Sequence, residues 1–199
     1  MTTIASLPAD EASWTGAQER AWGMVHGRFQ PFHNGHLACL SGAAARCERL
    51  LVGITNPDRH HLRPTPEDAN RHLPAANPFT YTERLLMVRA AAEAAGVTTM
   101  EVIPFPITEP ELWPDYVPDG TVHFLRVFSP WGAAKLERLR GHGYRTEVLD
   151  VAASKDVSGE QVRAAMRTGG DWKALVPPAV AAILDSLPSA RALAPDPAA

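Results

Sequence analysis

The sequence predicts an α/β fold with a doubly wound parallel sheet of five strands, and two observations lead to this prediction. Short apolar runs alternate along the chain with segments that have helix caps and a helical spacing of apolar residues. The chain of 199 residues, 45% of them hydrophobic, is also long enough to bury one sizeable core. We therefore expect a single domain over residues 20–188, between a disordered leader at 1–19 and a disordered tail at 189–199.

The predicted strands are short runs rich in branched apolar or aromatic residues. Residues 50–54 are apolar at successive positions, which is typical of a strand that a parallel sheet buries on both faces. Pro104 and Pro106 end the third run. The five predicted strands are residues 22–26, 50–54, 100–103, 122–128 and 145–149.

Helices are predicted between these strands and after the last of them, where they form a C-terminal helical segment. Thr80 and Glu83 have the spacing of a capping box, and an apolar stripe follows them as far as the stop signal at Gly96. Ser158 and Gln161 have the same spacing and begin another helix. The predicted helices are residues 37–47, 80–95, 131–140, 158–166 and 179–187.

Residues 27–36, with the sequence GRFQPFHNGH, join the first predicted strand to the first predicted helix. A helix N-terminus has free backbone N–H groups and a partial positive charge, which together favour an anion. Arg28, His33 and His36 add further donors at this joint, so the stretch predicts a binding site for a phosphate chain. It follows a strand of a doubly wound sheet, and such sheets bind ligands beyond the carboxyl ends of their strands.

Composition excludes several other classes of function. The formal net charge of −3 gives no support for a nucleic-acid partner or an anionic membrane surface. No apolar run approaches the roughly 18 residues of a membrane span, and residues 1–4 lack the start of a signal peptide, so we expect a cytoplasmic protein. Cys39 and Cys47 fall in one predicted helix, about 12 Å apart, which is beyond disulfide reach.

Residues 55–78 have no periodicity and contain several prolines, which predicts an inserted loop. Arg59 and Arg71 lie in it with three histidines, and we interpret it as a loop at the substrate edge. The alternative is a solvated insertion. A histidine cluster in a loop is a weak signal for a metal, so no metal ligand is assigned to a protein side chain.

The stretch at 27–36 resembles the signature of the HxGH nucleotidyltransferases, and in its full length it resembles the archaeal-type nicotinamide mononucleotide adenylyltransferases in particular. Three further stretches match that family in the same order. Residues 77–84 resemble its N/D-P-F-T-x-x-E-R element, residues 157–163 resemble its I-S-G-T-E-I-R element, and Trp113 falls where it places a tryptophan against the nicotinamide ring. The resemblance covers about residues 22–188 and implies a Rossmann-like nucleotidyltransferase fold.

The resemblance also implies the reaction. An acceptor phosphate oxygen would attack the α-phosphorus of a nucleoside triphosphate in line and expel pyrophosphate, so catalysis consists mainly of positioning and charge stabilisation. His33 and His36 would contact the triphosphate where charge builds in the transition state, while Arg28 and Arg163 would hold phosphate oxygens. Mg²⁺ would bridge the leaving phosphates. Because enzymes of this family often assemble, we also expect a homo-oligomer.

Two further groups of contacts are implied by the matched motifs. Residues expected to bind the nucleotide are Gly27, Phe29, Gln30, Gly35, Phe128, Ser129, Ser158 and Gly159. Residues expected to bind the acceptor are Trp113, Asn77, Phe79, Arg59 and Arg71. For Trp113 the alternative to ring stacking is simple packing, and for Arg163 the alternative is an ordinary position on a helix surface.

Departures from the family pattern leave the substrates open. Glu160 stands where the family usually has threonine, Ala76 stands where an arginine can occur, residues 104–107 lack an aspartate, and residues 128–131 replace an S-x-N-P-like turn. We expect ATP and nicotinamide mononucleotide as the substrate pair, with NAD as the product. The alternative is a CTP-dependent enzyme that activates a phosphonate or another small phosphorylated metabolite.

Two readings lie outside this enzyme class. The carboxylate of Glu160 would repel a phosphate chain at the predicted binding site. One alternative is therefore a regulator that binds a nucleotide but does not catalyse its transfer. A fragment of a class I aminoacyl-tRNA synthetase would have a similar motif of two histidines and a glycine, but the chain shows no anticodon-binding domain and no basic surface bias.

Overall fold

The computed structural model describes residues 22–59, 62, 64, 72–150 and 157–194. Within these residues, five strands form one parallel sheet in the order β3-β2-β1-β4-β5, which confirms the predicted fold class. Each strand overlaps its predicted segment. The strands are β1 Trp22–Gly27, β2 Arg49–Thr55, β3 Met100–Phe105, β4 Val122–Arg126 and β5 Arg145–Asp150.

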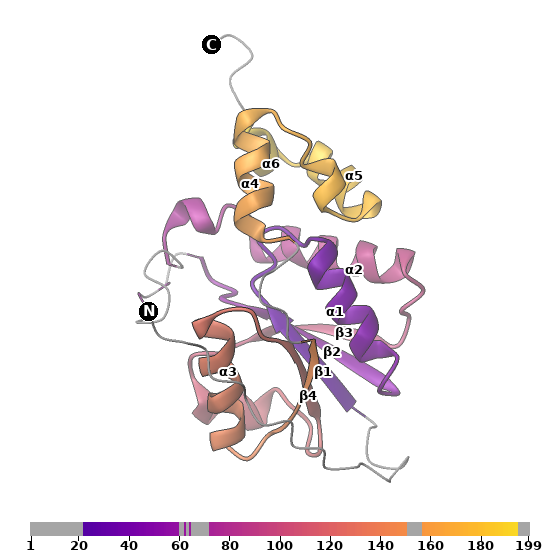
Figure 1. Ribbon diagram of the computed structural model, residues 1–199, viewed down its shortest axis with the longest axis vertical. Helices are drawn as coiled ribbons and strands as arrows, with labels where there is room; N and C mark the ends of the chain where they lie inside the picture. The colour runs from indigo at the N-terminus through magenta and orange to yellow at the C-terminus, as the bar shows by residue number, and fades with distance from the viewer. Residues whose placement is uncertain (1–21, 60–61, 63, 65–71, 151–156, 195–199) are drawn as a thin grey trace.

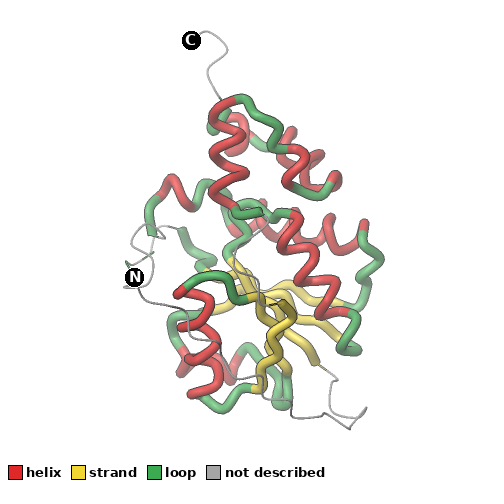
Figure 2. The backbone as a smooth tube through the Cα atoms, in the orientation of Figure 1, coloured by secondary structure: helices red, strands yellow, loops and turns green. Residues whose placement is uncertain are grey.

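Helices cover both faces of the sheet (Figure 1). The α-helices are α1 Asn34–Ala44, α2 Tyr81–Ala94, α3 Pro130–Gly141, α4 Gly159–Thr168, α5 Pro178–Ser186 and α6 Pro188–Arg191. Short 3₁₀ helices occur at η1 Pro74–Ala76, η2 Pro110–Asp115 and η3 Lys173–Leu175. Helices α1 and α2 lie on one face, α3 lies on the other, and α4 to α6 gather beyond one edge (Figure 2). None of the helices in the described ranges is long and apolar enough to cross a membrane.

Two apolar clusters hold the layers together, one on each face of the sheet. Neighbouring residues of β1 belong to different clusters, since Val25 packs toward α1 and α2 while Met24 packs toward α3. On β2, Val52 and Leu51 divide in the same way. Burial on both faces explains why these strands are apolar at successive positions.

Local signals account for where α2 and α4 begin. The Thr80 hydroxyl accepts a hydrogen bond from Glu83 N at 3.2 Å, and the Glu83 carboxylate accepts one from Thr80 N at 2.7 Å. Ser158 and Gln161 make the same reciprocal pair at 3.2 and 2.7 Å. Gly169 ends α4 with a φ of +68°, a conformation that glycine adopts without strain. Both predicted capping boxes are therefore confirmed.

The strand β4 ends at Arg126, two residues before the predicted end at Phe128. The reason is the start of α3. The Ser129 hydroxyl accepts from Gly132 N at 3.2 Å, and Pro130 takes the first helical position, where its missing N–H costs nothing. Phe128 and Ser129 therefore lie on the turn between the strand and the helix.

The predicted disordered tail at 189–199 begins too early, because α6 occupies its first residues. Ser189 Oγ donates to Glu83 Oε1 at 2.6 Å, and Ala190 is buried. The predicted leader and residues 195–199 lie outside the described residues.

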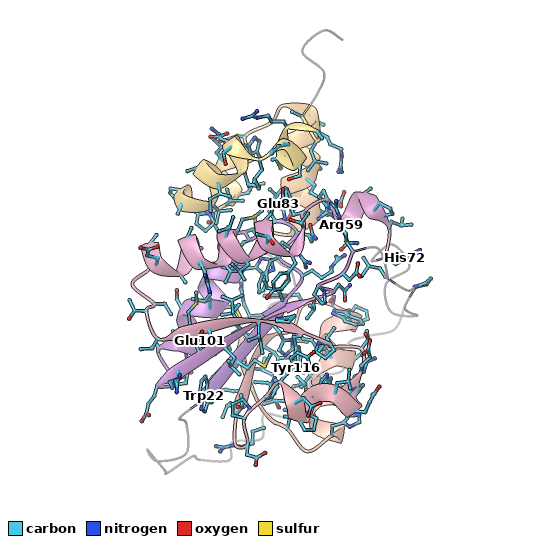
Figure 3. All side chains as sticks on the ribbon, turned by 180° about the vertical axis from the view of Figure 1, so that it is seen from behind. Trp22, Arg59, His72, Glu83, Glu101 and Tyr116 are labelled. Atoms are coloured by element: carbon cyan, nitrogen blue, oxygen red, sulfur yellow. The ribbon has the colours of Figure 1, made fainter. Side chains whose placement is uncertain are left out.

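The strand order creates a switch point beside β1. The chain runs from β1 to β2 and β3 on one side, and then to β4 and β5 on the other. The connection after β1 runs to one side of the sheet and the connection after β4 runs to the other side. Such a divergence opens a crevice at the carboxyl ends of the two strands. In Figure 3, Trp22 and Glu101 lie toward the amino end of the sheet, whereas Glu83 and Arg59 lie toward the opposite end, where α2 begins.

Candidate active site

A cavity of about 300 Å³ opens at this switch point. Its wall comes from the loop after β1, the ends of β2 and β4, α3 and the beginning of α4. The structure brings together on this wall all the residues that were predicted as catalytic or nucleotide-binding. They are Gly27, Arg28, Phe29, Gln30, His33, Gly35, His36, Phe128, Ser129, Ser158, Gly159 and Arg163.

The cavity wall is strongly cationic. Four basic side chains line it, and Glu160 supplies the one carboxylate among the lining residues. A concave wall that carries charge of one sign concentrates ligands of the opposite sign. The basic residues are Arg28, Arg126, Lys135 and Arg163. This arrangement suits a polyphosphate.

The two histidines of the motif form a stacked pair at the start of α1. Their ring centroids are 3.6 Å apart with 23° between the planes, and His33 is the N-cap residue. The backbone N–H of His33 donates to His36 Nδ1 at 3.3 Å. In a neutral imidazole only one nitrogen carries hydrogen, so this bond places the hydrogen of His36 on Nε2. His36 thereby presents a donor to an anion.

Aromatic rings fix the orientation of His36. The Phe29 ring meets it edge-on at a centroid distance of 4.9 Å, and the Phe32 ring lies at 5.4 Å. Phe29 is buried and has a φ of +53°. A Cβ on Gly35 would lie 3.3 Å from the His33 ring, so any other residue here would press on that ring. Phe29 therefore packs against His36 and also lines the cavity.

The side chain of Gln30 joins two of the predicted motifs. Its Nε2 donates to Phe79 O at 2.8 Å, and its Oε1 accepts from Phe79 N at 2.9 Å. Both ends of the amide are therefore engaged inside the protein, in place of the predicted nucleotide contact. Phe79 is fully buried and does not line the cavity, which corrects its predicted role in acceptor binding.

Arg163 reaches back from α4 to the first motif. It is 3% exposed, and its guanidinium donates to Gln30 O and to the carboxylate of Glu160. Glu160 also pairs with Arg167 at 2.9 Å. Burial lowers the pKa of Arg163, whereas the pair with Glu160 raises it. Arg163 is thus no ordinary surface residue of the helix.

The charge of Glu160 is offset by its neighbours. Burial alone would raise the pKa of this carboxyl group, but Arg163 and Arg167 outweigh that effect and hold the pKa below its usual value. Glu160 therefore stays ionised between two guanidinium groups. Repulsion of a phosphate chain, which was the reason to consider a silent regulator, is weakened by this pairing.

The beginning of α4 packs tightly on the first motif at Gly159. A Cβ at this position would lie 2.6 Å from the backbone oxygen of Gln30, which has no room to move aside. We expect Gly159→Ala to displace α4 and lower kcat/KM about 10- to 100-fold, because small misplacements of catalytic groups are costly.

Gly170→Ala is the matched control for that substitution. It lies beyond the other end of the same helix, and its added Cβ would meet only ordinary contacts at 3.6 Å and beyond. Steady-state kinetics of both variants decide the matter. Equal activity of Gly159→Ala and Gly170→Ala would contradict a role for this close contact.

Arg84 is a buried cation that sequence reasoning did not place at the site. It is 0% exposed, and burial lowers its pKa to about 10, so it keeps its charge at neutral pH. Its guanidinium donates to backbone oxygens at distances between 2.9 and 3.2 Å. The acceptors are the carbonyl groups of Arg28, Thr55, Asn56, Pro57 and Thr80. Arg84 thus ties the loops after β1 and β2 to the start of α2.

Arg126 and Lys135 are further cavity residues that sequence reasoning missed. Arg126 Nη1 donates to Gly35 O at 3.2 Å, and its guanidinium lies 4.6 Å from the Phe128 ring centroid. Lys135 lines the cavity from α3. A basic residue at the end of an apolar strand was the available signal for Arg126, because strand ends of this kind meet at the ligand edge.

Trp113 does not reach the cavity, so the prediction that it binds the acceptor is wrong. It is 0% exposed and belongs to the core cluster on the α3 face. Its Nε1 donates to Pro106 O at 2.9 Å, and its ring lies 5.8 Å from that of Phe105. The 3₁₀ helix η2 directs the indole into the core. Trp113 thus has the role given as the alternative to ring stacking, which is simple packing.

Two further predicted acceptor contacts, Asn77 and Arg59, also lie off the cavity wall. Asn77 is buried, with its Nδ2 donating to Leu73 O at 2.9 Å, and Arg28 Nη1 lies 3.4 Å from its Oδ1. It therefore contacts a cavity residue without lining the cavity. Arg59 Nη1 donates to Pro78 O at 2.6 Å, and Arg71 lies outside the described residues.

The side chains of the described ranges do not build a metal site. No group of three His, Cys, Asp or Glu side chains in these ranges is placed to hold an ion. Glu160, the carboxylate on the cavity wall, is engaged by two arginines. A resident Mg²⁺ held by protein ligands does not fit this arrangement.

Comparison with known proteins places the chain among nucleotidyltransferases. A family model described as cytidylyltransferase-like matches residues 24–142. A phosphonoformate cytidylyltransferase of Streptomyces viridochromogenes is 45% identical over 164 residues, covering 81% of this chain and 89% of that protein. A nicotinamide-nucleotide adenylyltransferase of Picrophilus torridus is 33% identical over 164 residues, covering 82% of this chain and 89% of that protein.

Solved structures show the same fold. A bifunctional NMN adenylyltransferase/ADP ribose pyrophosphatase from Francisella tularensis, complexed with AMP and a Mn ion, superposes with a TM-score of 0.61 at 17% identity. The match covers 87% of this chain and 52% of the other, so this chain spans about half the length of that protein.

Proposed function

The chain belongs to the cytidylyltransferase-like family and is a nucleotidyltransferase, and from this premise we propose that it transfers the cytidylyl group of CTP to a small phosphonate. The observation that carries this choice of acceptor is the burial of Trp113. The family resemblance implied that this ring stacks on a nicotinamide. Instead, the indole is packed in the core and does not line the cavity. The 45% identity to a phosphonoformate cytidylyltransferase supports the same choice.

The cationic wall would bind the triphosphate of CTP. Arg28, Arg163 and Lys135 line it, and arginine suits phosphate oxygens through its paired N–H groups. The first turns of α1 and α4 adjoin the same cavity and add the positive ends of two helix dipoles. The triphosphate is thereby held with its α-phosphorus near the histidine pair.

The transfer itself needs no covalent bond to the protein. A phosphonate oxygen forms a bond to the α-phosphorus, while the bond from that phosphorus to the oxygen bridging to the β-phosphorus breaks. The electron pair of the broken bond leaves with pyrophosphate. Negative charge grows on the α-phosphoryl oxygens and on the leaving group, where His36 Nε2–H donates. His33 fixes this tautomer through its backbone N–H.

A divalent cation, Mg²⁺, would enter as part of the CTP complex and neutralise charge on the leaving phosphates. The absence of a three-ligand group in the described ranges supports a cation held mainly by the nucleotide. Turnover should therefore stop in the presence of a chelator.

The deciding experiment measures pyrophosphate release over a grid of CTP and ATP against phosphonoformate, methylphosphonate and nicotinamide mononucleotide. We expect the highest kcat/KM for CTP with phosphonoformate. Faster turnover of ATP with nicotinamide mononucleotide would overturn the proposal in favour of the adenylyltransferase reading. Tight nucleotide binding without pyrophosphate from any pair would support a silent nucleotide-binding regulator.

A further inference from the structure

Three buried polar side chains, two on the cavity wall and one behind it, have no hydrogen-bond partner within the part of the chain that the structure describes. His26 is 8% exposed, Thr55 is 2% exposed and His123 is 0% exposed. Both ring nitrogens of each histidine and the hydroxyl of Thr55 are unpaired in this way. Buried polar atoms are nearly always paired in folded proteins, because an unpaired one is destabilising. Polar atoms left unpaired at a cavity therefore indicate that something polar binds there.

These side chains lie where the sheet meets the cavity. His26 and Thr55 both line the cavity from the carboxyl ends of β1 and β2. His26 is in register with Gly53, so Thr55 follows two residues later on the same face of the sheet. A Cβ on Gly53 would lie 2.6 Å from Met24 Cε, 2.9 Å from Phe105 Cβ and 3.2 Å from His26 Cβ, so this face of the sheet is tightly packed around His26. His123 lies behind His26, at a ring-centroid distance of 5.4 Å.

Both imidazoles are neutral. Burial lowers the pKa of His26 well below its usual value and that of His123 to about 3, and the nearby ammonium group of Lys135 adds to both shifts. Each ring therefore has one N–H donor and one acceptor nitrogen. Together with the Thr55 hydroxyl, the floor offers donors beside a lysine without adding a charge of its own.

We propose that His26 and Thr55, beside Lys135, form the subsite for the carboxylate of a phosphonocarboxylate acceptor. This inference rests on the proposed transfer to a phosphonate and names the acceptor class. In such an acceptor the carboxylate lies next to the phosphonate, so its subsite has to border the reaction centre. The floor of the cavity that His33 and His36 line meets that requirement.

Isosteric substitutions separate binding from structure. Thr55→Val keeps the shape of the side chain and removes the hydroxyl, and His26→Leu removes both ring nitrogens. Neither change breaks a hydrogen bond among the residues that the structure describes, so the melting temperature should stay the same or rise. The KM for phosphonoformate should rise about 10- to 100-fold, because each variant loses a bond to a charged group. The KM for CTP should not change.

Thr55→Ser is the matched control, since it keeps the hydroxyl and should bind phosphonoformate nearly as well as the unaltered protein does. Kinetics with methylphosphonate, which has no carboxylate, provide the second comparison. The Thr55→Val and His26→Leu variants should lose the preference for phosphonoformate over methylphosphonate. Equal effects on the two acceptors, or a melting temperature lowered by several degrees with an unchanged KM, would overturn the subsite.

The subsite can also be tested without turnover. If the unaltered protein transfers no cytidylyl group to either phosphonate, the proposed function fails. Calorimetric titration of phosphonoformate into the unaltered and Thr55→Val proteins then decides the subsite. Binding that weakens at least about tenfold in the variant supports it, and equal affinity or no binding to the unaltered protein refutes it.

Discussion

Replacing His36 by alanine is expected to lower kcat about 100- to 1,000-fold while leaving the KM for CTP nearly unchanged. The Nε2–H of this residue is fixed by the bond from His33 N to Nδ1 and by the surrounding aromatic rings. A donor held in this way acts where charge grows during the reaction, so its loss affects the transition state more than the bound substrate. The measurement is pyrophosphate release under saturating substrates.

Two control variants make this result specific. His36→Gln places an amide N–H near the position of Nε2 and should recover part of the activity. His142→Ala removes an exposed histidine after α3 and should leave turnover unchanged. Full activity in a folded His36→Ala protein would rule out the proposed role of His36.

The second large effect is expected on stability, from Arg84→Met. Methionine fills much of the same space but removes the guanidinium donor from the backbone oxygens of Arg28, Thr55, Asn56 and Pro57. We expect the free energy of unfolding to fall by at least about 3 kcal/mol, because each unpaired buried acceptor is costly. Urea denaturation followed by circular dichroism measures this change.

Arg89→Met is the matched control for Arg84→Met, since Arg89 is an exposed arginine on the same helix and should change stability by less than about 0.5 kcal/mol. Arg84→Lys should rescue little, because lysine has three donors at one point in place of a planar fork. Similar denaturation midpoints for Arg84→Met and Arg89→Met would show that the buried guanidinium contributes no stability.

The parts of the fold that follow from local chemistry could be predicted from the sequence. The capping boxes at Thr80 and Ser158 depend on residues three positions apart, so their spacing is visible in the chain. The strands follow from burial on both faces. The assembly of residues around His33 and His36 was predictable because a recognised motif follows a strand, and the strand ends of a doubly wound sheet meet at one edge.

Roles that depend on burial could not be predicted in this way. Nothing in the neighbouring residues of Trp113 shows that η2 turns its indole into the core. Arg84 resembles any charged residue in the first turn of a helix until the loops after β1 and β2 close around it. His26 lies in an apolar strand, and only the tertiary structure reveals that its ring nitrogens are unpaired beside a cavity.

The contacts of Gln30 have a consequence for how the protein reaches its native state. Its side chain pairs with a residue 49 positions away, and its backbone oxygen pairs with Arg163, 133 positions away. Contacts between such distant parts of the chain form only after long loops have closed, which slows folding. The cavity is therefore complete only when the whole domain has folded. A nucleotide that binds in the cavity therefore stabilises the entire native state by mass action. Only protein that has folded completely can bind it.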